Sequence, residues 1–163
     1  MENTHSKKIA FLDRDGVINK KAKEHCYITK KEDFIFNDGI FDVASQLQND
    51  SFKFIIITNQ RGIARGILTE EILNEIHLYM KIEFHKRGIE ILDVFYCPHE
   101  NNVCDCRKPK DGMLRKACEK YYIDKQESIL ISDSQEDIEM AKEFGIGKQY
   151  FIESDNIKSL VKI

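Results

Sequence analysis

The sequence predicts an α/β fold with a central, mostly parallel sheet flanked by helices. Short apolar runs rich in β-branched residues alternate along the chain with stretches in which apolar residues recur at helical spacing. This alternation is typical of an open parallel sheet with right-handed crossover connections. The chain of 163 residues is long enough for an ordinary hydrophobic core, and we expect a single domain over residues 1–163.

Five strands are expected, and the second of them is nearly all apolar, as in a strand covered on both faces. They occupy residues 9–12, 52–57, 91–96, 128–131 and 150–152. Four helices are expected at residues 38–47, 69–88, 113–122 and 134–144. Asp38 and Thr69 are placed to cap the first two helices, and Gly145 ends the last one. The polar, lysine-rich residues 20–33 predict a loop, which we call the flap.

Three of the apolar runs end in groups that can do chemistry. The first run ends in Asp13, the second in Thr58 and Asn59, and the fourth in Ser132 and Asp133. In open parallel sheets, ligands bind beyond the carboxyl ends of the strands. Three endings with complementary chemistry therefore indicate a functional site at that edge of the sheet.

Asp13 and Asp15 are two residues apart, so in extended geometry their side chains lie on the same face. Two carboxylates at such close range repel each other unless a cation sits between them or one keeps its proton. A hard cation such as magnesium prefers oxygen ligands, and Asp133 is a candidate for a further ligand. The alternative is a solvated strand end followed by an Asp-Gly turn at residues 15–16.

The same strand ends supply what an aspartate nucleophile needs to attack phosphorus: a cation, hydrogen-bond donors and an acid for the leaving oxygen. Asp13 can be the nucleophile, and Asp15 can be the general acid and then the base. Thr58 and the amide at Asn59 can donate hydrogen bonds to the phosphoryl oxygens. Lys108 can supply a fixed positive charge.

A short loop at residues 97–106 contains Cys97, His99, Cys104 and Cys106. Four soft or borderline ligands so close together predict a tetrahedral zinc site, and four protein ligands leave no open position, so the zinc would be structural. Its expected effect is to aim the next two residues at the substrate. The alternative, reduced thiols lining a loop, does not explain why both prolines of the chain also lie here. The other two cysteines are expected to be free thiols.

The composition limits the classes of molecule that the protein is expected to bind. The chain has 25 basic and 28 acidic residues and a formal net charge of −3, so the charge balance indicates neither a nucleic-acid nor a membrane partner. Residues 1–8 are polar, and no apolar run approaches the length of a membrane span. We therefore expect a cytoplasmic monomer that acts on a small molecule.

Four segments, taken in order, resemble the motifs of the haloacid-dehalogenase-like (HAD) phosphatases: Phe-Leu-Asp-Arg-Asp-Gly, Ile-Thr-Asn-Gln, Arg-Lys-Pro and Ser-Asp-x-x-x-Asp. The segment Thr-Asn-Gln-Arg-Gly-Ile-Ala-Arg-Gly and the cysteine-rich loop resemble, more closely, the heptose 1,7-bisphosphate phosphatases and their histidinol-phosphatase relatives. The resemblance covers roughly residues 8–152. It implies a Rossmann-like HAD fold without a large cap domain.

The resemblance also implies roles for individual residues. Asp13 would form an aspartyl-phosphate, and Asp15 would handle the proton. Magnesium would be held by Asp13, the main-chain carbonyl of Asp15 and Asp133, while Arg107 and Lys108 would contact the substrate phosphate. The further substrate-binding residues implied by the resemblance are Asn59, Gln60, Arg61 and the flap residues Glu24, His25, Cys26 and Tyr27.

Two departures from the family pattern are expected to matter. The family usually has Gly-Asp-Lys in the fourth motif, whereas this chain has Ser132-Asp133-Ser134, which lacks a cation near the metal and the phosphate. We favour a structural role for Ser134, because Ser-Gln-Glu-Asp resembles a capping sequence at a helix start. The flap is longer than usual and contains Cys26, which weakens any inference of sugar specificity.

These observations predict a phosphatase that uses magnesium and carries structural zinc. The expected reaction removes the 7-phosphate of D-glycero-D-manno-heptose 1,7-bisphosphate through an aspartyl-phosphate, in the biosynthesis of nucleotide-activated heptose for lipopolysaccharide or capsule. The alternatives are a histidinol-phosphate phosphatase and a phosphosugar-binding module with impaired turnover. A nucleic-acid 3′-phosphatase would need a basic groove, which the near-neutral composition does not indicate.

Overall fold

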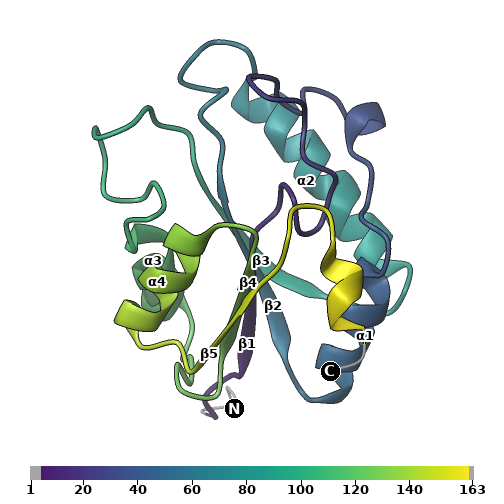
Figure 1. The fold of residues 1–163 in the computed structure, drawn as a ribbon, viewed down its shortest axis with the longest axis vertical. Coiled ribbons are helices and arrows are strands. Elements are labelled where there is room, and N and C mark those ends of the chain that lie inside the picture. Colours follow the sequence, from purple (N-terminus) through teal and green to yellow (C-terminus); the bar gives the residue numbers. More distant parts are fainter. Residues whose placement is uncertain (1–4, 162–163) are drawn as a thin grey trace.

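The structure is a computed structural model that describes residues 5–161, so residues 1–4 and 162–163 of the expected domain lie outside the described residues. Its centre is a sheet of five strands in the order β3-β2-β1-β4-β5, in which every neighbouring pair is parallel (Figure 1). The expected α/β fold with a parallel sheet is therefore confirmed. The strands are β1 (Ile9–Leu12), β2 (Lys53–Asn59), β3 (Ile91–Cys97), β4 (Ile129–Ser132) and β5 (Lys148–Phe151).

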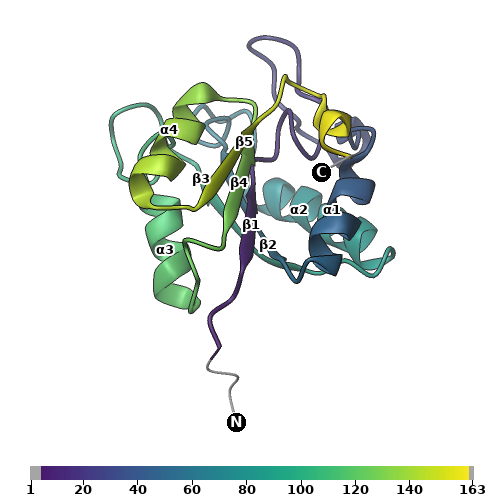
Figure 2. The ribbon, with the colours of Figure 1, turned by 60° about the horizontal axis from the view of Figure 1, so that its bottom comes forward.

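Helices cover both faces of this sheet. Figures 1 and 2 show α1 (Ile40–Asn49) and α2 (Glu70–His85) on one face and α3 (Gly112–Lys120) and α4 (Gln135–Phe144) on the other. The described elements all belong to this three-layer arrangement, and no large cap domain is present among them, as the resemblance implied. None of the described helices is both long and apolar enough to cross a membrane.

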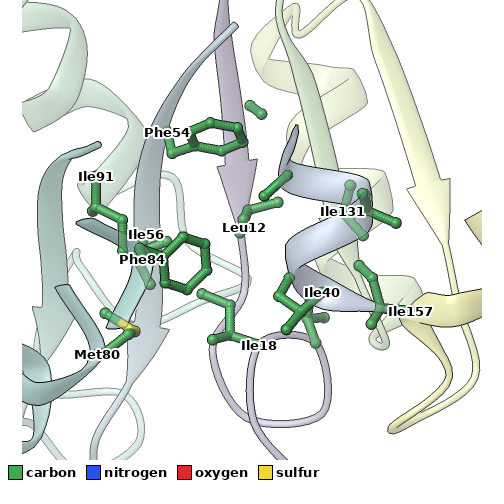
Figure 3. Packing of buried hydrophobic residues seen from close by; sticks show 14 of the residues in the cluster. Leu12, Ile18, Ile40, Phe54, Ile56, Met80, Phe84, Ile91, Ile131 and Ile157 are labelled. Atoms are coloured by element: carbon green, nitrogen blue, oxygen red, sulfur yellow. The ribbon is translucent and has the colours of Figure 1, made fainter. Parts of the chain in front are cut away.

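Buried side chains form two hydrophobic clusters, one on each face of the sheet. In β1, Ala10 and Leu12 belong to the cluster under α1 and α2, whereas Ile9 and Phe11 belong to the cluster under α3 and α4. Figure 3 shows part of the first cluster, with Leu12 lying among side chains from α1 and α2. Burial on both faces explains why β1, the middle of β2 and most of β4 are apolar throughout rather than alternating, whereas the edge strands β3 and β5 contain polar residues.

Two helix ends follow the expected capping. The Thr69 hydroxyl accepts a hydrogen bond of 3.2 Å from the Ile72 N–H at the start of α2. Gly145 follows α4 in the left-handed conformation. Two short 3-10 helices were not predicted: Lys31–Asp33 lies between β1 and α1, and Ile157–Leu160 follows β5. The first of them forms the end of the flap.

The expectation that Asp38 caps α1 is wrong. Gly39 occupies the cap position with φ of 85°, and no side chain caps the helix. A side chain at position 39 would come within 2.9 Å of the Lys158 Cα atom, so the packing of the second 3-10 helix requires glycine at this point. Helix α3 also ends at residue 120 rather than 122, because Tyr121 adopts an extended backbone.

The direction of the connections changes beside the central strand, β1. From β1 the chain proceeds outward through β2 to β3, and then returns to place β4 on the other side of β1. A switch point of this kind leaves a crevice at the carboxyl ends of the two strands, where α/β proteins bind ligands. Asp13 follows β1 and Asp133 follows β4, so both carboxyl groups lie at this crevice.

Candidate active site

A cavity of about 430 Å³ lies at the carboxyl ends of the strands. The side chains that line it come from the end of β1, the flap, the end of β2, the loop before α3 and the start of α4. Of the site residues predicted outside the cysteine-rich loop, Arg61 alone does not line this cavity. The fold therefore brings together groups that lie up to about 120 residues apart in the sequence, such as Asp13 and Asp133.

Lys108 is the centre of a buried group of charges. Its ammonium lies 2.9 Å from Asp13 Oδ1 and 2.6 Å from Asp137 Oδ2. The side chains of Lys108 and Asp137 are only 4% and 6% exposed. The Ser132 hydroxyl donates a hydrogen bond of 2.9 Å to the same Asp137 oxygen. Asp137 is thus satisfied by two donors, and it holds the lysine in place beside Asp13.

Burial raises the pKa of Asp13 to about 6, and the charges of Asp137 and Asp133 act in the same direction, while Lys108 opposes them. Burial alone would lower the pKa of Lys108, but Asp13 and Asp137 raise it well above its ordinary value, so the ammonium stays charged. At neutral pH the site therefore holds an ionised, poorly solvated carboxylate beside a fixed cation. This is the arrangement expected for a nucleophile that attacks a charged phosphoryl group.

Asp15 has a different environment, although it is only two residues from Asp13. Its Oδ1 accepts hydrogen bonds from Arg14 Nη2 at 2.7 Å and Asn19 Nδ2 at 3.0 Å, and its Oδ2 accepts one from Gln60 Nε2 at 3.0 Å. Burial acts to raise the pKa of Asp15, but the Arg14 guanidinium and these hydrogen bonds outweigh it and lower the pKa. The carboxyl group is therefore held in one orientation at the cavity.

Arg14, which holds Asp15, is only 1% exposed and is itself held by α2. Its Nη1 lies 3.2 Å from Nε2 of His77. Arginine has no acceptor, so Nε2 must accept this hydrogen bond and the imidazole proton is on Nδ1. Burial and the Arg14 charge lower the pKa of His77 to about 3, in agreement with a neutral ring. A chain of hydrogen bonds thus runs from α2 through Arg14 to the carboxyl group of Asp15.

The end of β2 contributes Thr58 and Asn59, which act differently. The buried Thr58 hydroxyl lines the cavity and accepts a hydrogen bond of 2.9 Å from Gln60. The Asn59 side chain donates to the Lys108 carbonyl at 3.1 Å and accepts from the Lys108 N–H at 3.0 Å. Asn59 therefore fixes the segment that carries the lysine, and its side-chain amide is engaged with the chain rather than free for substrate.

Asp133 is held through one of its two oxygens. Its Oδ2 accepts hydrogen bonds from Lys21 Nζ at 2.8 Å and from Ser154 Oγ at 2.5 Å, and no described residue donates to its Oδ1. Gly16 lies directly against this carboxylate with φ of 90°. A side chain at position 16 would collide with the Asp133 carboxylate, so both the backbone and the close approach require glycine.

The four flap residues predicted to bind substrate, 24–27, all line the cavity. Tyr27 fixes the flap to the loop after β2, because its hydroxyl accepts a hydrogen bond of 3.2 Å from Arg65. Its ring also lies 3.1 Å from the position that a Cβ atom at Gly62 would occupy. Glu24 and His25 are largely exposed, and they lie 3.5 Å from each other. The flap is therefore anchored at one side and open to solvent at its tip.

Arg61 connects two loops instead of lining the cavity. Its guanidinium lies 3.2 Å from the carboxylate of Glu100 and 3.4 Å from Asn101 Oδ1, both in the cysteine-rich loop. Glu100 also pairs with Arg65 at 3.1 Å. The loop after β2 is thus tied to the cysteine-rich loop by charge, and a contact between Arg61 and substrate stays a prediction.

The cysteine-rich loop brings its four candidate metal ligands together. The ligand atoms of Cys97, His99, Cys104 and Cys106 lie within 4.8 Å of one another. Contacts between them measure 3.2–3.6 Å, close to the roughly 3.7 Å edge of a tetrahedron with zinc–sulfur distances of about 2.3 Å. Burial opposes ionisation of these thiols and raises the pKa of Cys97 to about 12, whereas the N–H groups of Arg107 and Cys106 lower the pKa of Cys104 to about 6. The donor set and its spacing fit zinc.

The cavity offers hard oxygen donors that fit magnesium. Asp13 and Asp133 present carboxylates from the ends of adjacent strands, close enough for the charge of one to raise the pKa of the other. The Asp15 carboxylate is occupied by its hydrogen bonds, but its main-chain carbonyl accepts none from a described residue. Two carboxylates and one free carbonyl are the ligand types that magnesium takes.

Sequence reasoning missed Lys21, His77 and Ser154 as members of the site. Lys21 lies among other flap lysines, and no feature of the sequence distinguishes it from them. His77 lies among the buried residues of α2, so a polar residue on an apolar helical stripe was a signal that could have found it. Ser154 follows β5 in a segment that contains no motif.

Comparison with known proteins agrees with the motifs. A family model described as polynucleotide kinase 3 phosphatase matches residues 8–157. The chain is 37% identical over 155 residues to a D-glycero-beta-D-manno-heptose-1,7-bisphosphate 7-phosphatase of Vibrio cholerae, covering 90% of this chain and 82% of the relative. It is 43% identical over 140 residues to a D-glycero-alpha-D-manno-heptose-1,7-bisphosphate 7-phosphatase of Campylobacter jejuni, covering 86% and 79%.

Solved structures agree as well. The D,D-heptose 1,7-bisphosphate phosphatase from B. bronchiseptica, in complex with magnesium and phosphate, matches with a TM-score of 0.83 and 28% identity, covering 95% of this chain and 86% of that one. A structure from Mesorhizobium loti that is described as HAD-like shares the fold, with a TM-score of 0.77 and 22% identity over 90% of this chain and 72% of that one. The resemblance inferred from the motifs is thereby confirmed, and the chain belongs to the HAD-like phosphatases, in the family of the heptose 1,7-bisphosphate 7-phosphatases.

Proposed function

We propose that this chain is a magnesium-dependent phosphatase that removes the 7-phosphate of D-glycero-D-manno-heptose 1,7-bisphosphate. The observation that carries the proposal is the pairing of Asp13 with the buried ammonium of Lys108, 2.9 Å away, in a cavity shared with Asp133. A carboxylate that attacks phosphorus needs such a cation to reduce charge repulsion. The names of relatives at 37% and 43% identity supply the substrate class.

The side chains divide the reaction into two steps. An oxygen of Asp13 attacks phosphorus, the bond from phosphorus to the C7 oxygen breaks, and Asp15 gives its proton to that leaving oxygen. Water then attacks the phosphorus of the aspartyl-phosphate while the Asp15 carboxylate takes a proton from it, so inorganic phosphate leaves and Asp13 is restored. The lowered pKa of Asp15 favours its role as the base and opposes its role as the acid, so the proton for the leaving oxygen comes from the small protonated fraction of this carboxyl group. Its hydrogen bonds from Arg14 and Gln60 keep it oriented at the cavity.

Three groups of the cavity would hold the phosphoryl oxygens. Lys108 supplies a fixed charge, Thr58 supplies a hydroxyl, and Arg107 has a buried Nη1 with no hydrogen-bond partner among the described residues. Magnesium, held by Asp13, Asp133 and the main-chain carbonyl at position 15, would supply further positive charge between the carboxylate and the phosphoryl group. Zinc in the cysteine-rich loop would fix the segment that carries residues 107 and 108.

A phosphate-release assay with defined substrates tests the proposal. The purified chain with magnesium is given both anomers of the heptose bisphosphate and, separately, histidinol phosphate. We expect one or both heptose anomers to be preferred over histidinol phosphate by about 100-fold or more in kcat/KM, and phosphorus NMR of the product to show the 1-phosphate intact. Preference for histidinol phosphate would overturn the substrate assignment, and binding without any release would support a turnover-impaired module.

The match to a polynucleotide 3′-phosphatase model favours a second candidate substrate, a nucleic-acid 3′-phosphate. A protein that binds nucleic acid needs a basic groove for the phosphate backbone, whereas this chain has 25 basic and 28 acidic residues. A 3′-phosphorylated oligonucleotide in the same assay decides between the two substrates. Release from the oligonucleotide at the heptose rate would favour the second candidate.

A further inference from the structure

Ser134 cannot supply a positive charge to the site, and its side chain has another role. Its hydroxyl accepts a hydrogen bond from the Asp137 N–H, 3.5 Å away, and so caps α4, which confirms the structural role favoured from the sequence. A cation nevertheless reaches the Asp133 side of the cavity. It comes from the flap, where Lys21 places its ammonium 2.8 Å from Asp133 Oδ2.

The main chain of Lys21 is anchored by the segment that follows β5. Its N–H donates a hydrogen bond of 2.8 Å to Asp155 Oδ1, and the Asp155 N–H donates one of 2.8 Å to the carbonyl of Gly16. The neighbouring Ser154 donates to the same Asp133 oxygen as the Lys21 ammonium. The segment after β5 thus joins the base of the flap to Asp133, and the lysine side chain enters the cavity from a fixed point.

The ammonium groups of Lys21 and Lys108 pair with different carboxylates, and they differ in burial and in the number of carboxylates that each contacts. The Lys108 ammonium is buried between Asp13 and Asp137. The Lys21 ammonium pairs with Asp133 alone among the described residues, and its side chain is 53% exposed. An ammonium has three donors, so Lys21 can contact a phosphoryl oxygen in the cavity and keep its bond to Asp133.

We propose that Lys21 is a phosphate-binding residue of this site, which orients Asp133 through one oxygen and gives the transferred phosphoryl group a second positive charge. The inference rests on the proposed phosphatase function and deepens it. It explains how the site can bind a phosphoryl group with serine at position 134, because the positive charge comes from Lys21 in the flap instead of from a lysine in the fourth motif. The free Oδ1 of Asp133 stays available to a metal cation while Oδ2 is held.

Binding of inorganic phosphate to the magnesium-loaded protein tests the proposal directly. The variants are Lys21→Ala, the charge-conserving Lys21→Arg, and Lys20→Ala, which removes the same charge from an exposed neighbour outside the cavity. Titration calorimetry is expected to show that Lys21→Ala weakens phosphate binding by about 10- to 100-fold, the effect of one charge-assisted hydrogen bond. Lys21→Arg is expected to retain most of the affinity, and Lys20→Ala is expected to change it less than about twofold.

Magnesium affinity, measured separately without phosphate, distinguishes the proposal from a simpler role. If Lys21 only neutralises Asp133 in the metal-free protein, Lys21→Ala will tighten magnesium binding and leave phosphate binding unchanged. That result, or equal effects of Lys21→Ala and Lys20→Ala on phosphate binding, overturns the proposal. The test does not depend on the organic substrate, so a failed heptose assay with a clear loss of phosphate binding would reject the substrate and keep the role of Lys21.

Discussion

The cysteine-rich loop at residues 97–106, which we call the zinc loop after its four candidate ligands, and the phosphatase cavity are both clusters of ionisable groups. The chain assembles the two clusters differently. The four candidate zinc ligands lie within residues 97–106, and their ligand atoms are within 4.8 Å of one another. The cavity takes its side chains from β1, the flap, β2, the loop before α3 and α4. The geometry of the zinc loop is therefore largely local, whereas the geometry of the cavity depends on the whole sheet.

This difference predicts that substitutions in the two regions will affect different properties of the protein, its stability in one case and its turnover in the other. The zinc loop offers four protein ligands, so a metal bound there has no open position and acts by fixing the loop. In the cavity, burial keeps the pKa of Asp13 raised to about 6, and Asp133 has one oxygen to which no described residue donates a hydrogen bond. Groups in this condition cost stability but are available to a ligand. We expect changes in the cavity to affect turnover first, and changes in the zinc loop to affect stability first.

The largest expected effect is the loss of turnover in Asp13→Asn. An amide cannot attack phosphorus, so phosphate release is expected to fall by about 10³-fold or more. The Lys108 ammonium keeps Asp137 as a partner, and the substitution removes a carboxylate whose burial is unfavourable, so the thermal midpoint is expected to stay or rise. Sustained phosphate release would refute the assignment of the nucleophile.

Removal of zinc is expected to give the opposite pattern. Structural zinc contributes several kcal/mol to folding, so a strong chelator should lower the thermal midpoint by about 10 °C for a chain of this size. Hydrogen exchange should show residues 97–110 losing protection before magnesium affinity changes. Cys118→Ser is the matched control, because Cys118 is a free thiol outside the cluster and its loss should not alter the zinc content measured by mass spectrometry. Unchanged exchange after chelation would contradict a structural zinc.

The same contrast explains how much of each region could be predicted from the sequence. The zinc ligands could be predicted from their spacing, because they are neighbours in the chain. Asp13, Thr58 and Asp133 could also be predicted, because parallel strands bring their carboxyl ends to one edge. Lys21 could not, because the residue that anchors its main chain lies 134 positions later. Long-range packing also explains the wrong cap at Asp38, since the second 3-10 helix meets the chain there.

A smaller effect is expected from His77, the residue through which α2 holds Arg14 and, through Arg14, the carboxyl group of Asp15. The pKa of His77 is about 3 in the folded protein and about 6.5 in the unfolded chain. As the pH falls, the imidazole is therefore protonated in the unfolded chain before it is protonated in the folded protein. This contribution to the free energy of unfolding is complete above pH 6.5 and is lost as the pH falls toward 3, and the loss is about 2 kcal/mol at pH 5. His77→Gln keeps an acceptor for Arg14 but does not titrate, so this part of the acid sensitivity should disappear.

Urea unfolding at pH 7 and pH 5 measures this difference, with His85→Gln as the control on the exposed side of the same helix. His85→Gln should keep the pH dependence of the original chain. Equal pH dependence in His77→Gln and the original chain would show that burial and the Arg14 charge do not keep the ring neutral in the folded protein.

The smallest expected effects come from position 134, where the capping role and the missing charge can be separated. Ser134→Ala loses the cap of α4 and should cost about 1 kcal/mol of stability with little change in turnover. Ser134→Lys loses the same cap and adds a cation, but Lys21 already pairs with Asp133, so kcat/KM should change by less than about threefold. A rise of about 10-fold or more in Ser134→Lys would mean that the site lacks a cation in spite of Lys21. Such a rise would show that the Lys21 ammonium of the flap does not replace the positive charge that a lysine at position 134 gives to the phosphate.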